Sequence, residues 1–129
     1  EISACLVGSE MCIRDSYLRL YIRQAKAVGA IPIVLSPTPG NRWTDGKANR
    51  MTASYTQWAK EVAQQEGVEF IDLNDISADK LDKLGETQGR LLFKDSVHTT
   101  EEGALINGES VIEGLKNISG FSLNQYLKK

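Results

Sequence analysis

Hydrophobic positions along the chain alternate between helical spacing and short continuous runs. The spacing over residues 17–28 and 48–66 predicts two helices, each followed by a glycine that can end it. Residues 30–36 and 68–72 are short apolar runs, as expected of buried parallel strands. The order helix, strand, helix, strand predicts an α/β fold with a parallel sheet and helices on both faces. The helical positions expected to face the core are Leu18, Tyr21, Ile22, Ala25, Val28, Met51, Tyr55, Trp58, Ala59, Val62 and Ala63.

The second half of the chain is predicted to be mainly helical. Ser77 is expected to cap a short helix that runs to about Leu84. Thr99 and Glu102 have the spacing of a capping box at the start of a last helix. Residues beyond Gly120 are expected to form a tail or a short added helix. The core positions expected on the last helix are Ala104, Leu105, Val111, Ile112, Leu115 and Ile118.

Two loops and two strands complete the predicted domain. Residues 36–46 are dense in Pro, Gly and Asn, and residues 85–97 form a second loop region. Two parallel strands do not make a stable doubly wound sheet. We therefore expect the N-terminal part of the domain to be missing from this chain.

The first sixteen residues look foreign to the rest. Residues 1–16 have no clean helical or strand period, and residues 5–16 resemble translated sequencing-adapter read-through. We therefore expect residues 1–16 to be a non-native artefact and residues 17–129 to be the C-terminal part of a single domain. A poorly packed native terminus is the alternative.

Composition narrows the possible partners and cofactors. Of the 129 residues, 41% are hydrophobic and 25% are charged, and the net charge of −2 argues against nucleic-acid binding. The sequence contains no run of about 18 apolar residues, so it predicts no membrane helix. Two cysteines and one histidine cannot build a structural zinc site within this chain. We expect no metal and no cofactor.

The only histidine lies three residues after an aspartate. Asp95 and His98 fall in a predicted loop just before the last helix. A carboxylate beside an imidazole can hold its Nδ1–H and leave Nε2 as a general base. A surface histidine next to a helix start has the same spacing, so the pair alone is weak evidence for catalysis.

The surroundings of this pair resemble a known family. The run LLFKDSVHTTEEGA at residues 91–104 resembles the final conserved block of the GDSL, or SGNH, hydrolase superfamily, and is most similar to its rhamnogalacturonan acetylesterase branch. The loop 37–43, the helix 55–63 and the strand 68–73 resemble segments of the same branch in the same order. The resemblance covers residues 17–118 and implies a three-layer α/β/α sandwich with a parallel sheet, of the SGNH-hydrolase or flavodoxin-like type.

The resemblance also implies an activity. Asp95 would orient His98, and His98 would activate a nucleophilic serine that removes acetyl groups from a pectic or related polysaccharide. The family's Gly-Asp-Ser block, oxyanion-hole glycine and Asn-Asp block have no counterpart in this sequence, so we expect the chain alone to be inactive. The intact gene product is expected to be secreted or periplasmic, with an acetylated carbohydrate as its partner. The alternatives are another SGNH lipase, esterase or thioesterase, or a noncatalytic α/β binding module.

Three further residues are candidates for binding. Arg42 and Trp43 could contact sugar, because arginine pairs with uronate carboxylates and an indole stacks on sugar rings. Trp43 could equally pack the loop onto the edge of the sheet. Asp72, at the end of the second strand, could bind a metal, but a carboxylate there more often caps a turn.

Overall fold

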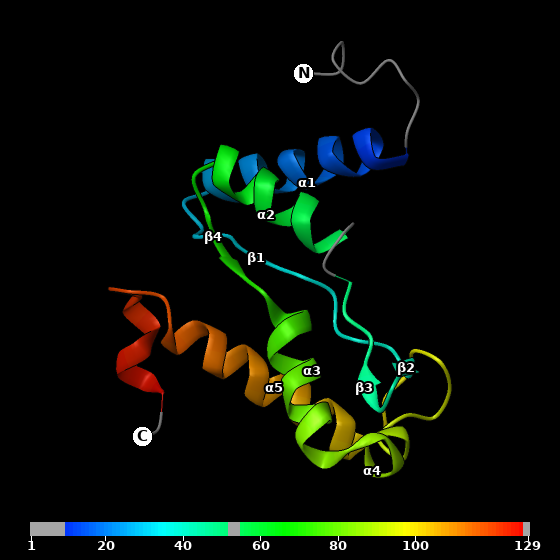
Figure 1. The fold of residues 1–129 in the computed structure, drawn as a ribbon. Coiled ribbons are helices and arrows are strands. Elements are labelled where there is room, and N and C mark those ends of the chain that lie inside the picture. Colours follow the sequence, from blue (N-terminus) through cyan, green and yellow to red (C-terminus); the bar gives the residue numbers. More distant parts are fainter. Residues whose placement is uncertain (1–9, 52–54, 128–129) are drawn as a thin grey trace.

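The structure is a computed structural model that describes residues 10–51 and 55–127 (Figure 1). Its elements are α1 (Glu10–Ala27), β1 (Ile33–Leu35), β2 (Trp43–Thr44), β3 (Lys47–Ala48), α2 (Tyr55–Gln65), β4 (Glu69–Ile71), α3 (Leu73–Leu84), α4 (Glu86–Arg90), α5 (Glu101–Lys116) and the 3-10 helix η2 (Ser122–Tyr126). Within the described residues, no helix is both long and apolar enough to cross a membrane.

A parallel pair of strands forms the centre of the fold. β1 pairs with β4, so that Val34 lies opposite Phe70. These two side chains pack with α1 and α2, while Ile33 and Ile71 point to the other face and pack with α5. The strand pleat therefore gives each face of the sheet its own helical cover. This arrangement confirms the predicted α/β class.

Helix α1 differs from the prediction at its start and in its orientation. It begins at Glu10 rather than Tyr17, and Arg14 lies over the ring of Tyr55, 4.4 Å from its centroid. Residues 1–9 lie outside the described part, so the predicted foreign origin of residues 1–16 stays a prediction. Tyr21 and Val28 were expected in the core but are 63% and 82% exposed. Tyr21 is exposed because α1 contacts α2 through the neighbouring side that carries Ile22, and Val28 lies just beyond the end of α1.

The predicted second helix starts later than expected. Lys47 and Ala48 form β3, which pairs antiparallel with β2, and α2 begins only at Tyr55. The tight turn between the strands places Asp45 and Gly46 at φ of 51° and 76°. Asp-Gly is a preferred pair for such a hairpin turn, so this signal was present in the sequence within the predicted loop. Met51, expected in the core, is 37% exposed.

Two predicted helix caps are misplaced. Helix α3 is capped by Asp72, whose side chain accepts a hydrogen bond from the Asp75 amide, and Ser77 is buried inside the helix. Helix α5 is capped by Thr100 rather than Thr99, since Thr99 bridges to Phe93. In both cases an adjacent strand-like pairing sets where the helix can begin.

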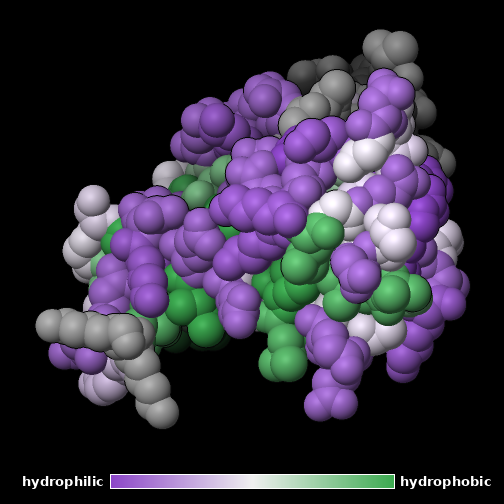
Figure 2. All heavy atoms as spheres, turned by 60° about the horizontal axis from the view of Figure 1, so that its bottom comes forward, coloured by the Kyte–Doolittle hydropathy of each residue, from purple (hydrophilic) through white to green (hydrophobic). Residues whose placement is uncertain are grey.

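Helix α5 packs through small residues. Leu105 and Ile112 were expected in the core but are 63% and 42% exposed, whereas Gly103, Ser110 and Gly114 are buried. A Cβ at Gly114 would lie 2.3 Å from Cγ2 of Ile71, so the helix approaches β4 more closely than a larger residue permits. The face of the molecule drawn in Figure 2 shows hydrophobic side chains at the surface among hydrophilic ones.

Candidate active site

A short hairpin-like loop carries the predicted catalytic pair. Phe93 bridges antiparallel to Thr99, and the Lys94 amide donates a 2.8 Å hydrogen bond to the carbonyl oxygen of His98. The Thr100 amide donates to the carbonyl oxygen of Leu92 at 2.9 Å before α5 begins. The loop is thereby closed at its base, and it presents residues 94–98 to solvent.

Asp95 and His98 meet as the sequence predicts. Oδ2 of Asp95 lies 2.6 Å from Nδ1 of His98, and Oδ1 accepts hydrogen bonds from the amides of Val97 (2.8 Å) and His98 (2.7 Å). The carboxylate thus organises the turn and orients the ring at the same time. With Nδ1 held by Asp95, Nε2 is the nitrogen able to exchange a proton with a reacting group.

The surrounding hydrogen bonds keep Asp95 ionised. The backbone amides of His98 and Val97, and then the His98 ring, lower the pKa of Asp95 to about 2. Because the pKa of Asp95 is lower in the folded protein, its ionisation stabilises the fold fully at pH values above the ordinary carboxyl pKa of about 3.9. This contribution is lost as the pH falls through about 2. The carboxylate therefore remains available to His98 at any mildly acidic or neutral pH.

We expect the Asp95 carboxyl group to titrate with a midpoint near pH 2. His98→Ala should leave most of this depression in place, because the two backbone amides that contribute most remain. A ¹³C NMR pH titration of the aspartate carboxyl carbons in both proteins measures the two midpoints. A wild-type midpoint near the ordinary value of about 4 would contradict the turn geometry.

The loop after β1 contacts the catalytic loop, defined as residues 94–98 because these carry the predicted catalytic pair. The Asn41 amide donates a 2.9 Å hydrogen bond to the carbonyl oxygen of Ser96, which lies between Asp95 and His98. Arg42, the next residue, is exposed. The structure therefore brings the segment that carries Arg42 beside the catalytic loop, beyond the carboxyl end of β1 (Figure 1). Ligands of α/β proteins bind at this end of the sheet.

Trp43 packs in the core of the hairpin region. Its ring lies against Gly89, where an added Cβ would come within 2.3 Å of the indole. The ring is half-buried with Ala48, Ala78 and Leu81, and Nε1 donates a 2.9 Å hydrogen bond to Oδ1 of Asn41. These are packing contacts, but they are made with α3, α4 and β3 rather than with the edge of the β1–β4 sheet that the sequence suggested. Sugar binding by Trp43 stays a prediction.

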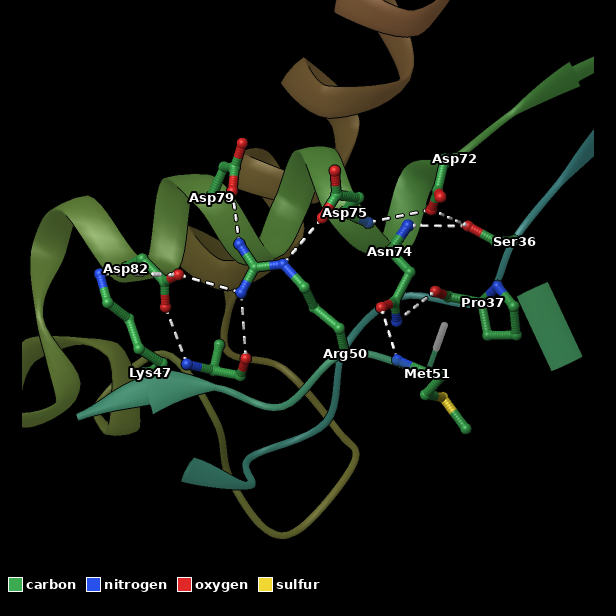
Figure 3. Close-up of polar contacts among 11 residues, drawn as sticks. Ser36, Pro37, Lys47, Arg50, Met51, Asp72, Asn74, Asp75, Asp79 and Asp82 are labelled. Atoms are coloured by element: carbon green, nitrogen blue, oxygen red, sulfur yellow. Dashed lines mark hydrogen bonds and ion pairs between the residues drawn. The ribbon is translucent and has the colours of Figure 1, made fainter. Parts of the chain in front are cut away.

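A buried polar network, which the hydrophobic pattern of the sequence does not predict, fixes the start of the loop after β1 (Figure 3). Asn74 is 1% exposed; its Nδ2 donates to the carbonyl oxygen of Pro37 (3.0 Å) and its Oδ1 accepts from the Met51 amide (2.9 Å). Ser36 donates to Asp72 (3.0 Å) and accepts from the Asn74 amide (2.8 Å). The first turn of α3 therefore holds both ends of the segment between β1 and α2.

Arg50 ties the hairpin to α3. It donates hydrogen bonds to Asp75 (2.7 Å) and Asp82 (3.0 Å), and also to Asp79 (Figure 3). The hydrogen bond to Asp75 is the largest of the effects that raise the pKa of Arg50. Burial alone would raise the pKa of Asp82, but the Ala48 amide and Arg50 hold that pKa below its usual value. Aspartates at intervals of three or four residues on α3 were the sequence signal for this contact.

The described residues offer no cluster of three or more His, Cys, Asp or Glu side chains suited to a metal ion. Asp72, the candidate considered from sequence, acts instead as the cap of α3 and a partner of Ser36. A recess of about 380 Å³ lies beside β4 and the end of α5, where Glu69, Asp72, Gly114 and Asn117 are among its lining residues. It contains neither Asp95 nor His98, so it is separate from the candidate active site.

Two curated proteins are similar in sequence. The chain is 28% identical over 102 residues to a rhamnogalacturonan acetylesterase of Emericella nidulans, and covers 41% of that protein with 78% of its own length. It is 28% identical over 119 residues to the probable rhamnogalacturonan acetylesterase YesY of Bacillus subtilis, and covers 54% of it with 88% of its own length. The chain thus spans about half the length of these relatives. No family model matches the chain.

Solved structures of other proteins have folds similar to that of this chain. The protein YxiM of Bacillus subtilis superimposes with a TM-score of 0.75 at 26% identity, over 83% of this chain and 32% of that one. A variant of Axe2, an acetyl-xylooligosaccharide esterase of Geobacillus stearothermophilus, gives a TM-score of 0.62 at 19% identity, over 82% of this chain and 47% of that one. The printed names of the two curated relatives are those of rhamnogalacturonan acetylesterases, one of them probable, and the Axe2 variant shows a similar fold.

Proposed function

We propose that this chain is the C-terminal part of an SGNH-type carbohydrate O-acetylesterase. The observation that carries the proposal is the 2.6 Å contact between Asp95 Oδ2 and His98 Nδ1 in an exposed loop. The names of the two curated relatives support acetylated rhamnogalacturonan, a pectic polysaccharide, as the substrate class. In this proposal the two strands β1 and β4 belong to a larger parallel sheet within a three-layer α/β/α sandwich.

The reaction assigned to this pair is transfer of an acetyl group to serine and then to water. His98 Nε2 accepts the serine hydroxyl proton while the serine oxygen attacks the acetyl carbonyl carbon. The imidazolium then donates this proton to the departing sugar oxygen, which leaves an acetyl-serine. Water, deprotonated in turn by Nε2, attacks the acetyl-serine, and the imidazolium returns this proton to the serine oxygen as acetate is released. Ionised Asp95 stabilises the imidazolium in both steps.

The nucleophile in this proposal belongs to a Gly-Asp-Ser block outside the chain. The oxyanion-hole glycine and the Asn-Asp block are assigned to the same outside part. The chain alone is therefore proposed to be inactive, and residues 1–16 are proposed to be foreign to the domain, with residues 17–129 native. A polymeric pectic substrate supports a secreted or periplasmic location for the intact product.

Release of acetate from defined substrates by the longer protein tests this function. Acetylated rhamnogalacturonan should be hydrolysed faster than a long-chain acyl ester or an acyl thioester. A preference for either of the latter would favour another SGNH lipase, esterase or thioesterase. Binding of the oligosaccharide without any ester hydrolysis would favour the noncatalytic module.

Arg42→Ala in the longer protein is expected to raise KM for an acetylated, uronate-containing oligosaccharide about tenfold. Arg42 is exposed on the loop that touches the catalytic loop, and a hydrogen bond to a charged group contributes about 1.5–3 kcal/mol. Steady-state kinetics should show a smaller rise in KM for a small aryl acetate, which has no carboxylate. Arg42→Lys is the matched control, because lysine keeps the positive charge but cannot make the bidentate hydrogen bonds of a guanidinium group. An equal rise for both substrates would contradict the assignment.

A further inference from the structure

The peptide between Asp95 and His98 is held from outside its own loop. The Asn41 amide donates a 2.9 Å hydrogen bond to the Ser96 carbonyl oxygen. Gly40 lies so close that a Cβ there would be 2.8 Å from the same oxygen. Glycine permits a backbone approach of this kind without a clash. The segment after β1 therefore supports the turn that carries His98.

Asn41 is in turn anchored to the core. Its Oδ1 accepts the 2.9 Å hydrogen bond from Trp43 Nε1, and the Trp43 ring packs on Gly89 beneath the hairpin. The Asn49 amide also donates a 2.8 Å hydrogen bond to the carbonyl oxygen of Arg42. These contacts limit the movement of Asn41 relative to the body of the domain.

The catalytic loop needs support of this kind. The side chains of Asp95 and His98 are 52% and 75% exposed, so neighbouring side chains do little to restrain them. The hydrogen bonds from Val97 and His98 to Asp95 are internal to the turn. The Val97 amide belongs to the same planar peptide unit as the Ser96 carbonyl, so a shift of that peptide disturbs both the shape of the turn and its position relative to the domain. A general base must lie within hydrogen-bond reach of the proton that it accepts, so position matters as much as shape.

We propose that Gly40 and Asn41 are positioning residues for His98, acting through the Ser96 carbonyl with Trp43 as their anchor. The proposal rests on the proposed function, because it takes His98 as the base of an esterase. Gly40 provides the close approach, Asn41 provides the hydrogen bond, and Trp43 transmits the rigidity of the core to both.

The test uses the fact that the chain contains a single histidine, so ¹⁵N NMR of the imidazole reports His98 alone. Wild-type protein should show one tautomer, with the proton on Nδ1. Gly40→Ala should lose the hydrogen-bonded Nδ1–H resonance and shift both ¹⁵N signals toward those of a free imidazole. Gly108→Ala is the matched control, because a Cβ there meets nothing within 4 Å. A wild-type imidazole spectrum in Gly40→Ala would overturn the proposal.

A second pair of variants decides the matter if Gly40→Ala does not fold. Asn41→Ala removes the acceptor for Trp43 Nε1, and Asn41→Asp keeps it. The tautomer signal should weaken in the first and recover in the second. A merely structural role would lower the urea midpoint of Asn41→Ala and leave its imidazole signals unchanged, which would overturn the proposal.

Kinetics of the longer protein separate this proposal from the proposed function. Gly40→Ala should lower kcat for an aryl acetate by about 10²-fold with KM unchanged, as expected when a catalytic group is misplaced by about 1 Å. An unchanged kcat would overturn the positioning role. If the wild-type longer protein hydrolyses no ester, the proposed function fails, and the imidazole spectra still decide whether Gly40 and Asn41 position His98.

Discussion

His98→Ala in the longer protein is expected to lower kcat for acetyl esters by about 10⁴-fold or more. The substitution removes the group that accepts the serine proton, while the loop keeps its backbone hydrogen bonds to Asp95. Steady-state assays with an aryl acetate measure kcat, and circular dichroism checks that the fold is intact. The side chain is 75% exposed, so we expect little change in the free energy of unfolding.

Asp95→Asn is the matched variant for this experiment. An asparagine amide donates to Nδ1 rather than accepting from it, which favours the tautomer with the proton on Nε2, and such a change costs about 10⁴-fold in a serine triad. The kcat values of His98→Ala and Asp95→Asn should therefore both be lowered by a similar factor. Ester hydrolysis at the wild-type rate by a folded His98→Ala protein would contradict the assignment of His98 as the base.

Asn74→Ala is expected to lower the free energy of unfolding by about 2–4 kcal/mol. The side chain is 1% exposed and bonds to the Pro37 carbonyl and the Met51 amide, so its removal leaves both backbone groups without this partner. Urea unfolding of the chain, followed by circular dichroism, measures the loss.

Asp79→Ala on the same helix provides the control for Asn74. Its side chain is 59% exposed and contacts Arg50, so removing it should cost less than about 1 kcal/mol. Equal losses for the two variants would show that the buried amide does not hold the segment between β1 and α2. A selective loss at Asn74 would confirm the network as the support of this segment.

The elements predicted from hydrophobic spacing are present, but several of their ends are shifted. Six elements overlap a range that was predicted to form the same kind of element: α1, β1, α2, β4, α3 and α5. Some errors fall at ends where a contact from elsewhere intervenes, and helix α4 forms inside residues 85–97, which were predicted to be a loop. Lys47 and Ala48 were expected at the start of a helix and instead pair with β2, and Thr99 was expected as a cap and instead bridges to Phe93.

The candidate site was predicted where its parts are close in sequence. Asp95 and His98 are three residues apart, and the turn between them closes on hydrogen bonds to the Asp95 side chain itself. Such a turn depends on local residue types, which a sequence displays directly. The resemblance of residues 91–104 to a hydrolase block added the assignment of the pair to catalysis.

The sequence by itself determined the α/β order of elements, the apolar strands and the Asp95–His98 pair. These features arise from periodicity and turn chemistry over a few neighbouring positions. Only the tertiary structure decided that Asn41 supports Ser96, that Asn74 holds Pro37, and that Trp43 packs on Gly89. Asn74 and Pro37, for example, are 37 positions apart. Contacts over such separations depend on the path of the folded chain, which no local pattern specifies.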